Sequence, residues 1–204
     1  MHDSGQLNIR SMVMGEGQAA VLDGKELKRV EAVIFSKEQA ERNQSMMDFS
    51  FRCGMRVKEI ASLELSDVVG ADGKLKKSFT LESKKTKGNK NREIYLQDKT
   101  LVNNLKIYLA VRGDQRGPLF LSRKGGSFSP NTMQMAFKRL FKAAGIDGAS
   151  SHSGRRTFAT TLINKGYNLV MIAELMGHSS IEMTRKYVTT NPVDNARATM
   201  DLYK

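Results

Sequence analysis

The stretch HSGRRTFATTLINKGYNLVMIAELMGHSSIEMTRKY, residues 152–187, organises the rest of the chain. A helical pattern of apolar residues runs over 153–165, and Gly166 follows it, where a glycine ends a helix. Asn168 is typical of a residue that caps the start of the next helix, which Gly177 ends in turn. The stretch therefore predicts two consecutive helices, each ended by a glycine.

The same stretch carries an unusual set of functional side chains. His152 and Arg155 are three residues apart, so on a helix they share one face. His178 directly follows the second glycine stop, and Tyr187 comes nine residues later in a polar segment, where a core tyrosine is less expected. Together these residues predict a cluster of anion-binding groups around a candidate nucleophile.

The charge of the chain indicates a polyanionic partner. Lysine and arginine number 33 against 21 aspartate and glutamate residues, which leaves a net charge of +12 in 204 residues. This balance favours nucleic acid over a membrane surface, because no amphipathic anchor segment stands out in the sequence. The alternative is that the basic surface merely keeps the protein soluble.

Composition also limits the class of protein and its compartment. A chain of 204 residues with 40% hydrophobic residues fits one soluble globular domain. No apolar run approaches the ~20 residues that cross a bilayer, and the N-terminus lacks the pattern of a secretory signal. The single cysteine, Cys53, cannot form an internal disulfide and is expected to be a small buried packing residue. The sequence also lacks the closely spaced Cys/His pairs of a structural zinc site, and we expect a cytoplasmic protein.

The first third of the chain shows mostly helical patterns. Residues 1–20 have no sustained period and are expected to form a flexible arm. Asp23 is suited to cap a first helix, a second helix is expected over 39–53, and a short third helix over 56–63. Arg56 is therefore expected in the first turn of a helix, just after a glycine stop.

Strand signals replace the helical patterns between about residues 65 and 96. Short β-type runs at 68–69, 78–81 and 93–96 are separated by turn-forming residues, which predicts a three-stranded antiparallel β-sheet. The second hairpin of this sheet is rich in cations, namely Lys84, Lys85, Lys87, Lys90 and Arg92. Such a run is either a solvated loop or a clamp for the phosphates of a nucleic-acid backbone.

Helical patterns resume after the sheet. Apolar spacing predicts a helix over 101–109, and Ser129 followed by proline marks the start of another that runs to about residue 144. A final helix is expected over 193–204. With no internal repeat and no second domain, the predicted fold is mainly α with one small three-stranded antiparallel sheet.

The candidate groups match what the attack on a phosphodiester requires. The reaction needs a nucleophile, positive donors on the non-bridging oxygens and a proton source for the leaving alkoxide. Arginine suits the oxygens because its planar fork is permanently charged and bidentate. Tyrosine suits a reversible reaction, because a phosphotyrosine ester can be attacked again by a waiting hydroxyl.

Four motifs carry a resemblance to a known family. They are CGMRVKEIASLELSDV at 53–68, TKGNKNREIYL at 86–96, HSGRRTFATTL at 152–162 and LMGHSSIEMTRKY at 175–187. In this order they resemble the signatures of the tyrosine recombinase (phage integrase) family, and the likeness extends from about Val21 to the C-terminus. Any one motif is weak evidence, but four in order with this spacing are specific.

The resemblance implies six catalytic residues: Arg56, Lys87, His152, Arg155, His178 and Tyr187. The two arginines would hold the scissile phosphate, and the lysine would protonate the leaving 5′ oxygen. A shift of register along the hairpin would exchange this lysine for Lys85 or Lys90. The first histidine would assist proton transfer, the second would donate a hydrogen bond to the phosphate, and the tyrosine would be the nucleophile. Glu59 also matches a family position and is expected to orient its neighbours.

The implied reaction cuts and rejoins DNA through a 3′-phosphotyrosine intermediate, without metal, nucleotide or other cofactor. The implied partner is double-stranded DNA, bound by a tetramer on paired sites. Lys84, Lys85, Lys90 and Arg92 are expected to contact DNA, as is Arg156, which stands where many members have histidine or lysine. The expected setting is the nucleoid of a prokaryote, or a phage or other mobile element.

The chain also departs from the usual family pattern. Members usually carry an N-terminal DNA-clamping domain, whereas here only about 20 residues precede the likeness. The expected organisation is a catalytic domain over 21–204 that includes a C-terminal helix after the nucleophile. Accessory DNA-binding proteins are then expected partners. Two alternatives remain open, namely a non-catalytic DNA-binding regulator on the same fold and a type IB topoisomerase-like enzyme that relaxes DNA.

Overall fold

The computed structural model describes residues 18–84 and 91–188. Of Lys85 it describes the backbone but not the side chain. Four of the sequence-based expectations concern residues outside these described ranges. The arm expected over 1–20 lies almost wholly outside the described residues, as does the helix expected over 193–204. Lys87 and Lys90 of the cationic hairpin also lie outside them.

Four helices form the first part of the described fold. They are α2 (Gly24–Phe35), α3 (Ala40–Cys53), α4 (Val57–Ala61) and α5 (Leu65–Val68). Asp23 caps α2 as predicted, because its carboxylate accepts the amide N–H of Glu26 while the Glu26 carboxylate accepts the amide N–H of Asp23. Gly54 ends α3 in the left-handed conformation, at a φ of 61°.

Over the described residues, five helices follow the sheet. They are α6 (Lys99–Arg112), α7 (Pro130–Ala143), α8 (Ser153–Asn164), α9 (Leu169–Met176) and α10 (Glu182–Arg185). The predicted caps are present, since Ser129 caps α7 and Asn168 caps α9 through their side-chain oxygens. Gly177 ends α9 at a φ of 60°, in the left-handed conformation that glycine adopts without strain. The helical part of the predicted fold is therefore confirmed over the described residues.

The sheet has two strands rather than the three that the sequence predicted. Strand β1 (Ser78–Leu81) pairs antiparallel with β2 (Arg92–Tyr95), with Ser78 opposite Tyr95. A single 3₁₀ turn, η1 (Ser83–Lys85), follows β1. Within the described ranges these two strands make up the whole sheet.

The expected first strand at 68–69 is wrong because the chain forms a helix there. Glu64 and Asp67 start α5, since the Asp67 carboxylate accepts the amide N–H of Glu64. Val68 completes that helix and is fully buried, and Val69 makes only an isolated bridge with Leu75. Two adjacent valines favour a strand in isolation, but burial against the core holds Val68 at the end of a helix instead, and Val69 alone is extended.

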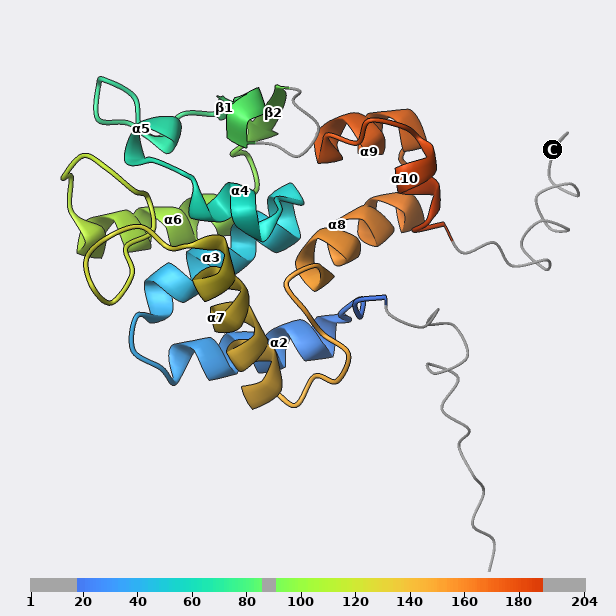
Figure 1. Ribbon diagram of the computed structural model, residues 1–204, viewed down its shortest axis with the longest axis horizontal. Coiled ribbons are helices and arrows are strands. Elements are labelled where there is room, and N and C mark those ends of the chain that lie inside the picture. Colours follow the sequence, from blue (N-terminus) through green and yellow to red (C-terminus); the bar gives the residue numbers. More distant parts are fainter. Residues whose placement is uncertain (1–17, 86–90, 189–204) are drawn as a thin grey trace, which may run out of the picture.

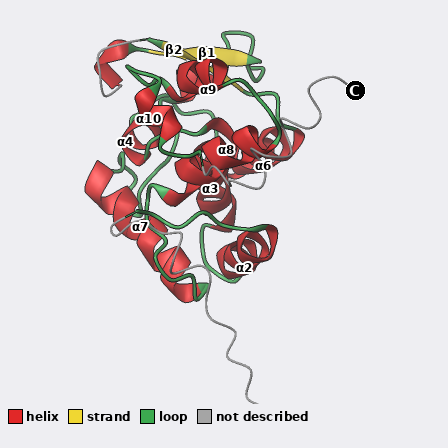
Figure 2. Ribbon diagram, turned by 90° about the vertical axis from the view of Figure 1, so that its right-hand side faces the viewer, coloured by secondary structure: helices red, strands yellow, loops and turns green. Residues whose placement is uncertain are grey.

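Helix α3 lies at the centre of the molecule, with α2, α6, α7 and α8 around it (Figures 1 and 2). Most residues along this helix are buried, and Phe49 is fully enclosed in the main core. The main core also contains Ile34 of α2 and Phe137 of α7. Cys53 is buried at the end of α3, and burial raises the pKa of its thiol to about 12, as befits a packing residue.

Helices α8, α9 and α10 form one side of the molecule, next to the β1–β2 hairpin and α4 (Figure 1). Helices α8 and α9 share a small core, built from Ala159 of α8 and from Ile172 and Met176 of α9. Tyr187 packs against this small core from the segment after α10. In the part of the chain that the structure describes, no helix is long and apolar enough to cross a membrane.

Candidate active site

The first arginine of the predicted site is placed by a sharp change of direction between α3 and α4. Gly54 makes this turn, and a Cβ atom at this position would lie 2.5 Å from the Phe158 ring of α8, so only glycine fits. Arg56 follows as the N-cap of α4 rather than within its first turn. Its side chain is mostly buried, with 16% of its surface exposed.

Glu59 holds Arg56 in this position. One carboxylate oxygen, Oε1, accepts Nη1 of Arg56 at 2.8 Å, and the other, Oε2, accepts the Arg56 amide N–H at 2.8 Å. The Glu59 side chain is almost fully buried. The expectation that Glu59 orients its neighbours therefore agrees with the geometry.

Arg92 is placed differently from the sequence-based expectation that it contacts DNA. Its side chain is 4% exposed and points into the molecule, where Nη2 donates to Oε2 of Glu59 at 2.5 Å. Its Nη1 donates to the carbonyl oxygen of Leu175 at 2.6 Å. Both terminal nitrogens of the guanidinium are therefore bound to protein groups, an internal placement that the sequence reasoning did not anticipate.

The second arginine of the predicted site, Arg155, lies in the first turn of α8. Its Nη1 donates to the Gly54 carbonyl oxygen at 2.6 Å, and its Nη2 donates to the Met176 carbonyl oxygen at 2.5 Å. Burial, together with the nearby charges of Arg56 and Arg92, lowers the pKa of the Arg155 guanidinium to about 9. The group therefore stays cationic at neutral pH, within a tight cluster of arginines.

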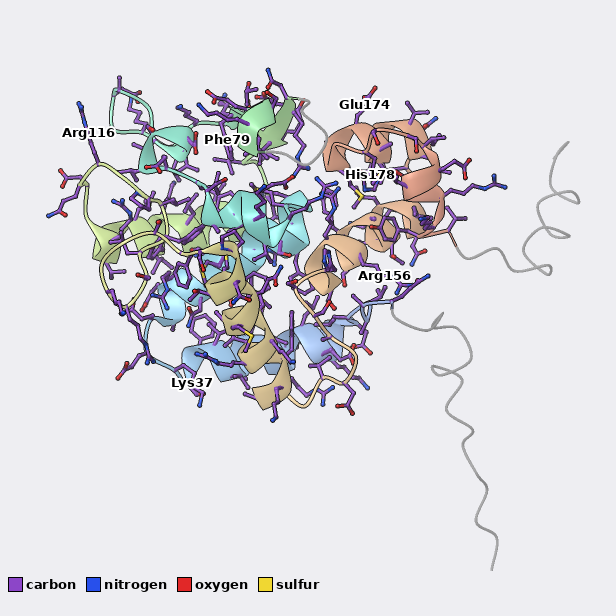
Figure 3. All side chains as sticks on the ribbon, viewed as in Figure 1. Lys37, Phe79, Arg116, Arg156, Glu174 and His178 are labelled. Atoms are coloured by element: carbon purple, nitrogen blue, oxygen red, sulfur yellow. The ribbon has the colours of Figure 1, made fainter. Side chains whose placement is uncertain are left out.

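His178 follows the left-handed turn at Gly177 and faces the same cluster. In Figure 3 it lies between α9 and α8, whereas Glu174 of α9 points outward into solvent. Burial, and then the charge of Arg155 followed by those of Arg56 and Arg92, lowers the pKa of the His178 imidazole to about 4. The imidazole is therefore neutral at physiological pH.

The His178 ring is held by two contacts. Its Nδ1 forms a 2.7 Å hydrogen bond with the Thr184 hydroxyl of α10. Its other contact is with the ring of Tyr187, which stacks on it with the centroids 6.1 Å apart and the planes at 23°. The sequence reasoning missed Thr184, which stands six residues after His178 on the short helix before the tyrosine.

Tyr187 is brought to the cluster from the segment after α10. Its amide N–H donates to the Thr184 carbonyl oxygen at 3.0 Å, which fixes the turn that carries it. The ring is half-buried, between the small core of α8 and α9 and the imidazole of His178. A negative charge on Tyr187 would raise the pKa of Arg155, which shows that the phenol and the guanidinium lie within electrostatic reach.

His152, Arg156 and Lys84 are the remaining predicted residues whose side chains the structure describes. His152 is the N-cap residue of α8, three positions before Arg155, and its side chain is exposed. Arg156 points away from His178, and its Nη1 donates to the Ala19 carbonyl oxygen at 2.7 Å (Figure 3). Lys84 is exposed and forms an ion pair with Glu82.

The arrangement combines a permanent positive charge with a neutral imidazole and a phenol. Arg56, Arg155, His178 and Tyr187 come from four different elements and meet at one place in the fold. The arginines can bind a phosphate, the imidazole can donate one hydrogen bond, and the phenol is a candidate nucleophile. Within residues 18–85 and 91–188, no group of three or more His, Cys, Asp or Glu residues is arranged to hold a metal ion.

Comparison with known proteins identifies the family. The model of the phage integrase family matches residues 20–193. The tyrosine recombinase XerC of Bacillus licheniformis is 30% identical over 190 residues, which cover 80% of this chain and 58% of the relative. The tyrosine recombinase XerA of Pyrococcus horikoshii is 31% identical over 160 residues, covering 76% and 53% respectively. The chain thus spans little more than half the length of these relatives.

Solved structures show the same fold. The crystal structure of XerA recombinase superposes with a TM-score of 0.72 at 23% identity, over 94% of this chain and 66% of that one. A lambda integrase dimer bound to a COC′ core site gives a TM-score of 0.67 at 19% identity, over 85% and 49%. The fold is therefore that of a tyrosine recombinase catalytic domain, and the chain belongs to the phage integrase family.

Proposed function

We propose that this protein is a site-specific DNA recombinase that cuts and rejoins double-stranded DNA through a 3′-phosphotyrosine intermediate. The observation that carries the proposal is the meeting of Arg56, Arg155, His178 and Tyr187 from four separate elements. A protein that only binds DNA needs the positive charge but has no use for a phenol stacked on a neutral imidazole.

The two arginines bind the scissile phosphate in this proposal. Arg155 uses two of the five N–H donors of its guanidinium on the carbonyl oxygens of Gly54 and Met176, so the remaining donors are left for phosphate oxygens. The two carbonyl oxygens hold the guanidinium rigid. A rigid cation stabilises the negative charge that develops on the phosphate without having to reorganise. Arg56, held through Glu59, supplies the second positive charge.

His178 acts as a neutral hydrogen-bond donor. When the Thr184 hydroxyl donates to Nδ1, the neutral ring carries its proton on Nε2, which then donates to a phosphate oxygen. A neutral donor suits this place, because an imidazolium beside three arginines would be repelled by their charges.

Tyr187 attacks the phosphorus atom in the proposed reaction. The phenolate oxygen forms a bond to phosphorus, and the bond from phosphorus to the 5′ oxygen breaks. Lys87 gives its proton to that leaving oxygen, and His152 assists removal of the tyrosine proton. The free 5′-hydroxyl of a partner strand then attacks the phosphotyrosine, releases the enzyme and completes strand exchange.

The proposed substrate is double-stranded DNA, which the net charge of +12 supports. The curated relatives are named tyrosine recombinases, and XerH and lambda integrase have been solved in complexes with DNA. Lys84, Lys85, Lys90 and Arg156 are proposed to contact the backbone. The catalytic domain would span 21–204, following a flexible arm, and a helix over 193–204 would join the subunits of a tetramer on paired sites.

The proposed surroundings of the protein follow from this activity. A recombinase works where its DNA lies, which for a prokaryotic, phage or other mobile-element protein is the nucleoid in the cytoplasm. Accessory DNA-binding proteins are proposed partners that add affinity for DNA.

The test is covalent capture of DNA by the wild-type protein and by Tyr187→Phe. A pool of nicked duplexes with randomised half-sites traps the adduct, because the short strand beyond the nick is lost after cleavage. We expect a denaturation-resistant protein–DNA adduct with wild type and none with Tyr187→Phe. Adduct formation by both proteins would overturn the role of Tyr187. Failure of the wild type on the pool, and on fragments of host DNA, would instead favour a non-catalytic DNA-binding regulator.

A second arm separates recombination from relaxation. Duplexes recovered from the pool are placed twice on a supercoiled plasmid, and the products are examined for exchanged strands. Strand exchange supports the recombinase, whereas relaxation without exchange would favour the type IB topoisomerase-like alternative.

A further inference from the structure

Arg92, at the start of β2, connects three elements of the site. Its Nη2 donates to Oε2 of Glu59 on α4, and its Nη1 donates to the carbonyl oxygen of Leu175 on α9. The side chain is 4% exposed, so these contacts are shielded from water. In the sequence Arg92 stands five residues after Lys87.

The contact with Glu59 extends to the first catalytic arginine. Glu59 has one oxygen, Oε2, shared between Arg92 and the amide N–H of Arg56, and its other oxygen accepts Nη1 of Arg56. The carboxylate is buried, with 1% of its surface exposed, and Arg56 and Arg92 hold its two oxygens. Movement of Arg92 would therefore change the position of Arg56.

The contact with Leu175 acts on the other half of the site. The last carbonyl groups of a helix have no partner within the helix, and cations are favourable there. Two arginines take this role at the end of α9, because Arg92 binds the carbonyl oxygen of Leu175 and Arg155 binds that of Met176. His178 stands two residues after Met176, so these contacts hold the end of the helix from which its ring projects.

Gly177 provides the room that Arg92 needs. A Cβ atom at this position would lie 2.7 Å from Cδ of Arg92, closer than real side chains approach. The glycine therefore has two functions, since it also adopts the positive φ that ends α9. The close approach shows that the arginine stem packs directly under the turn that carries His178.

We propose that Arg92 is a positioning residue that holds Arg56 and His178 in register across the phosphate site. The inference rests on the proposed function, since the register matters for the attack of Tyr187 on phosphorus. Arginine is required because its rigid fork reaches two acceptors on different elements at once, whereas a lysine ammonium is a compact point charge. Arg92 touches neither DNA nor the reacting atoms.

The first test compares Arg92→Met with Arg92→Lys in single-turnover formation of the Tyr187 adduct. Misplacement by about 1 Å lowers a rate roughly 100-fold, so we expect a fall of about that size for Arg92→Met at saturating protein. Arg92→Lys should recover part of the rate, because it keeps the charge but loses one anchor. The Kd for DNA should stay within about threefold of the wild-type value, since the side chain is internal.

An opposite pattern would overturn the proposal. If Arg92 contacted the DNA backbone, Arg92→Met would weaken binding and reduce the salt slope of log K by about 1. The rate at saturating protein would then stay at the wild-type value. A wild-type rate with unchanged binding would equally contradict a positioning role.

A second test does not depend on activity. The His178 imidazole faces the charges of Arg56, Arg92 and Arg155, and its pKa is lowered to about 4. An NMR pH titration, with the His178 signal assigned by means of His178→Gln, would measure this pKa. We expect a small rise of the pKa in Arg92→Met, because burial, Arg155 and Arg56 lower it more than Arg92 does, and no rise in Arg92→Lys, which keeps the charge. An unchanged pKa in Arg92→Met would show that Arg92 does not act on His178.

Arg52→Met is the matched control, because Arg52 is also an arginine that joins two elements. It pairs with Asp48 of α3 and with Asp98 before α6, outside the phosphate site. We expect lower stability but a wild-type cleavage rate per folded molecule and an unchanged His178 titration. An equal loss of rate in Arg52→Met would mean that general destabilisation explains both variants. If the wild type itself forms no adduct, the proposed function fails while the titration still decides the role of Arg92.

Discussion

At the scale of single residues, the charge state of the site depends on burial. Arg155 and His178 both have lowered pKa values, of about 9 and about 4, and in each the largest cause is desolvation. The two shifts have opposite consequences at neutral pH, because the arginine remains charged while the histidine remains neutral. The site therefore presents fixed cations beside a neutral donor.

The low pKa of His178 predicts a pH dependence of stability. An unfolded histidine titrates near pH 6.5, whereas His178 in the folded protein titrates near pH 4. Between these values the unfolded state binds more protons, so the free energy of unfolding falls as the pH is lowered. This loss of stability is absent above about pH 6.5 and complete by about pH 4. Because the ring is only half-buried, we expect a discounted loss of about 1 kcal/mol.

Denaturant unfolding at pH 7 and pH 5 measures this contribution. The variant His178→Gln serves as the reference, since it keeps every other titrating group of the chain. The wild type should lose more stability than the variant between the two pH values. Equal losses would mean that the pKa of His178 is close to its ordinary value.

At the scale of the elements, the site depends on close packing of α8 against α3. Gly154 allows this approach, because a Cβ atom at its position would lie 2.3 Å from the Ser50 hydroxyl oxygen and 2.8 Å from the Phe51 ring. Arg155 is the next residue, and its reach to the Gly54 carbonyl oxygen requires the helices to stay this close.

Gly154→Ala is therefore expected to destabilise the protein. Overpacking of a tight interface costs about 1–3 kcal/mol, and each kcal/mol lowers Tm by roughly 2–4 °C in a domain of this size. Calorimetry or thermal circular dichroism measures the change. Gly24→Ala is the matched control, since no atom lies within 4 Å of the added Cβ at the start of α2. A Tm for Gly154→Ala equal to that of the control would contradict the close packing.

At the scale of the whole molecule, Tyr187, the proposed nucleophile, belongs to the smaller of the two cores that the described residues form. The main core surrounds α3, whereas Tyr187 packs on the cluster of Ala159, Ile172 and Met176. Local stability follows the number of buried apolar contacts, so a small cluster opens at lower free energy than a large one. The part of the molecule that carries Tyr187 is thus expected to open more readily than the part that carries Arg56.

Amide hydrogen exchange tests this difference. Amides of α9 and α10 should exchange faster than those of α3 and α7 under native conditions, although all four are helices. Equal protection throughout would show that the two cores open as one cooperative unit.

The net charge leads to a further prediction at this scale. Affinity for DNA should fall steeply with salt, because phosphate contacts release counterions. Lys84→Gln should lower affinity and reduce the slope of log K against log salt by about 1, whereas Glu82→Gln on the same hairpin should raise affinity. If neither variant changes binding, the cationic hairpin is a solvated loop rather than a phosphate clamp.

The sequence by itself determined the helices, their caps and the family. Helical period and caps such as Asp23 with Glu26, or Ser129 before Pro130, depend on residues within one turn of each other, so they can be read locally. The four motifs likewise sufficed to name Arg56, Arg155, His178 and Tyr187 as the candidate site. The strand expected at 68–69 failed because burial of Val68 overrode a local preference.

Only the tertiary structure decided which cations are exposed and which are internal. Arg92 looked like its lysine neighbours on the hairpin, but its partners stand 33 positions before and 83 positions after it. The role of Thr184 as the partner of His178 also depends on the turn that follows Gly177. Burial and charge pairing between distant segments are set by packing, which no local pattern records. For this reason the sequence identified the candidate catalytic groups, while the structure alone revealed how they are held.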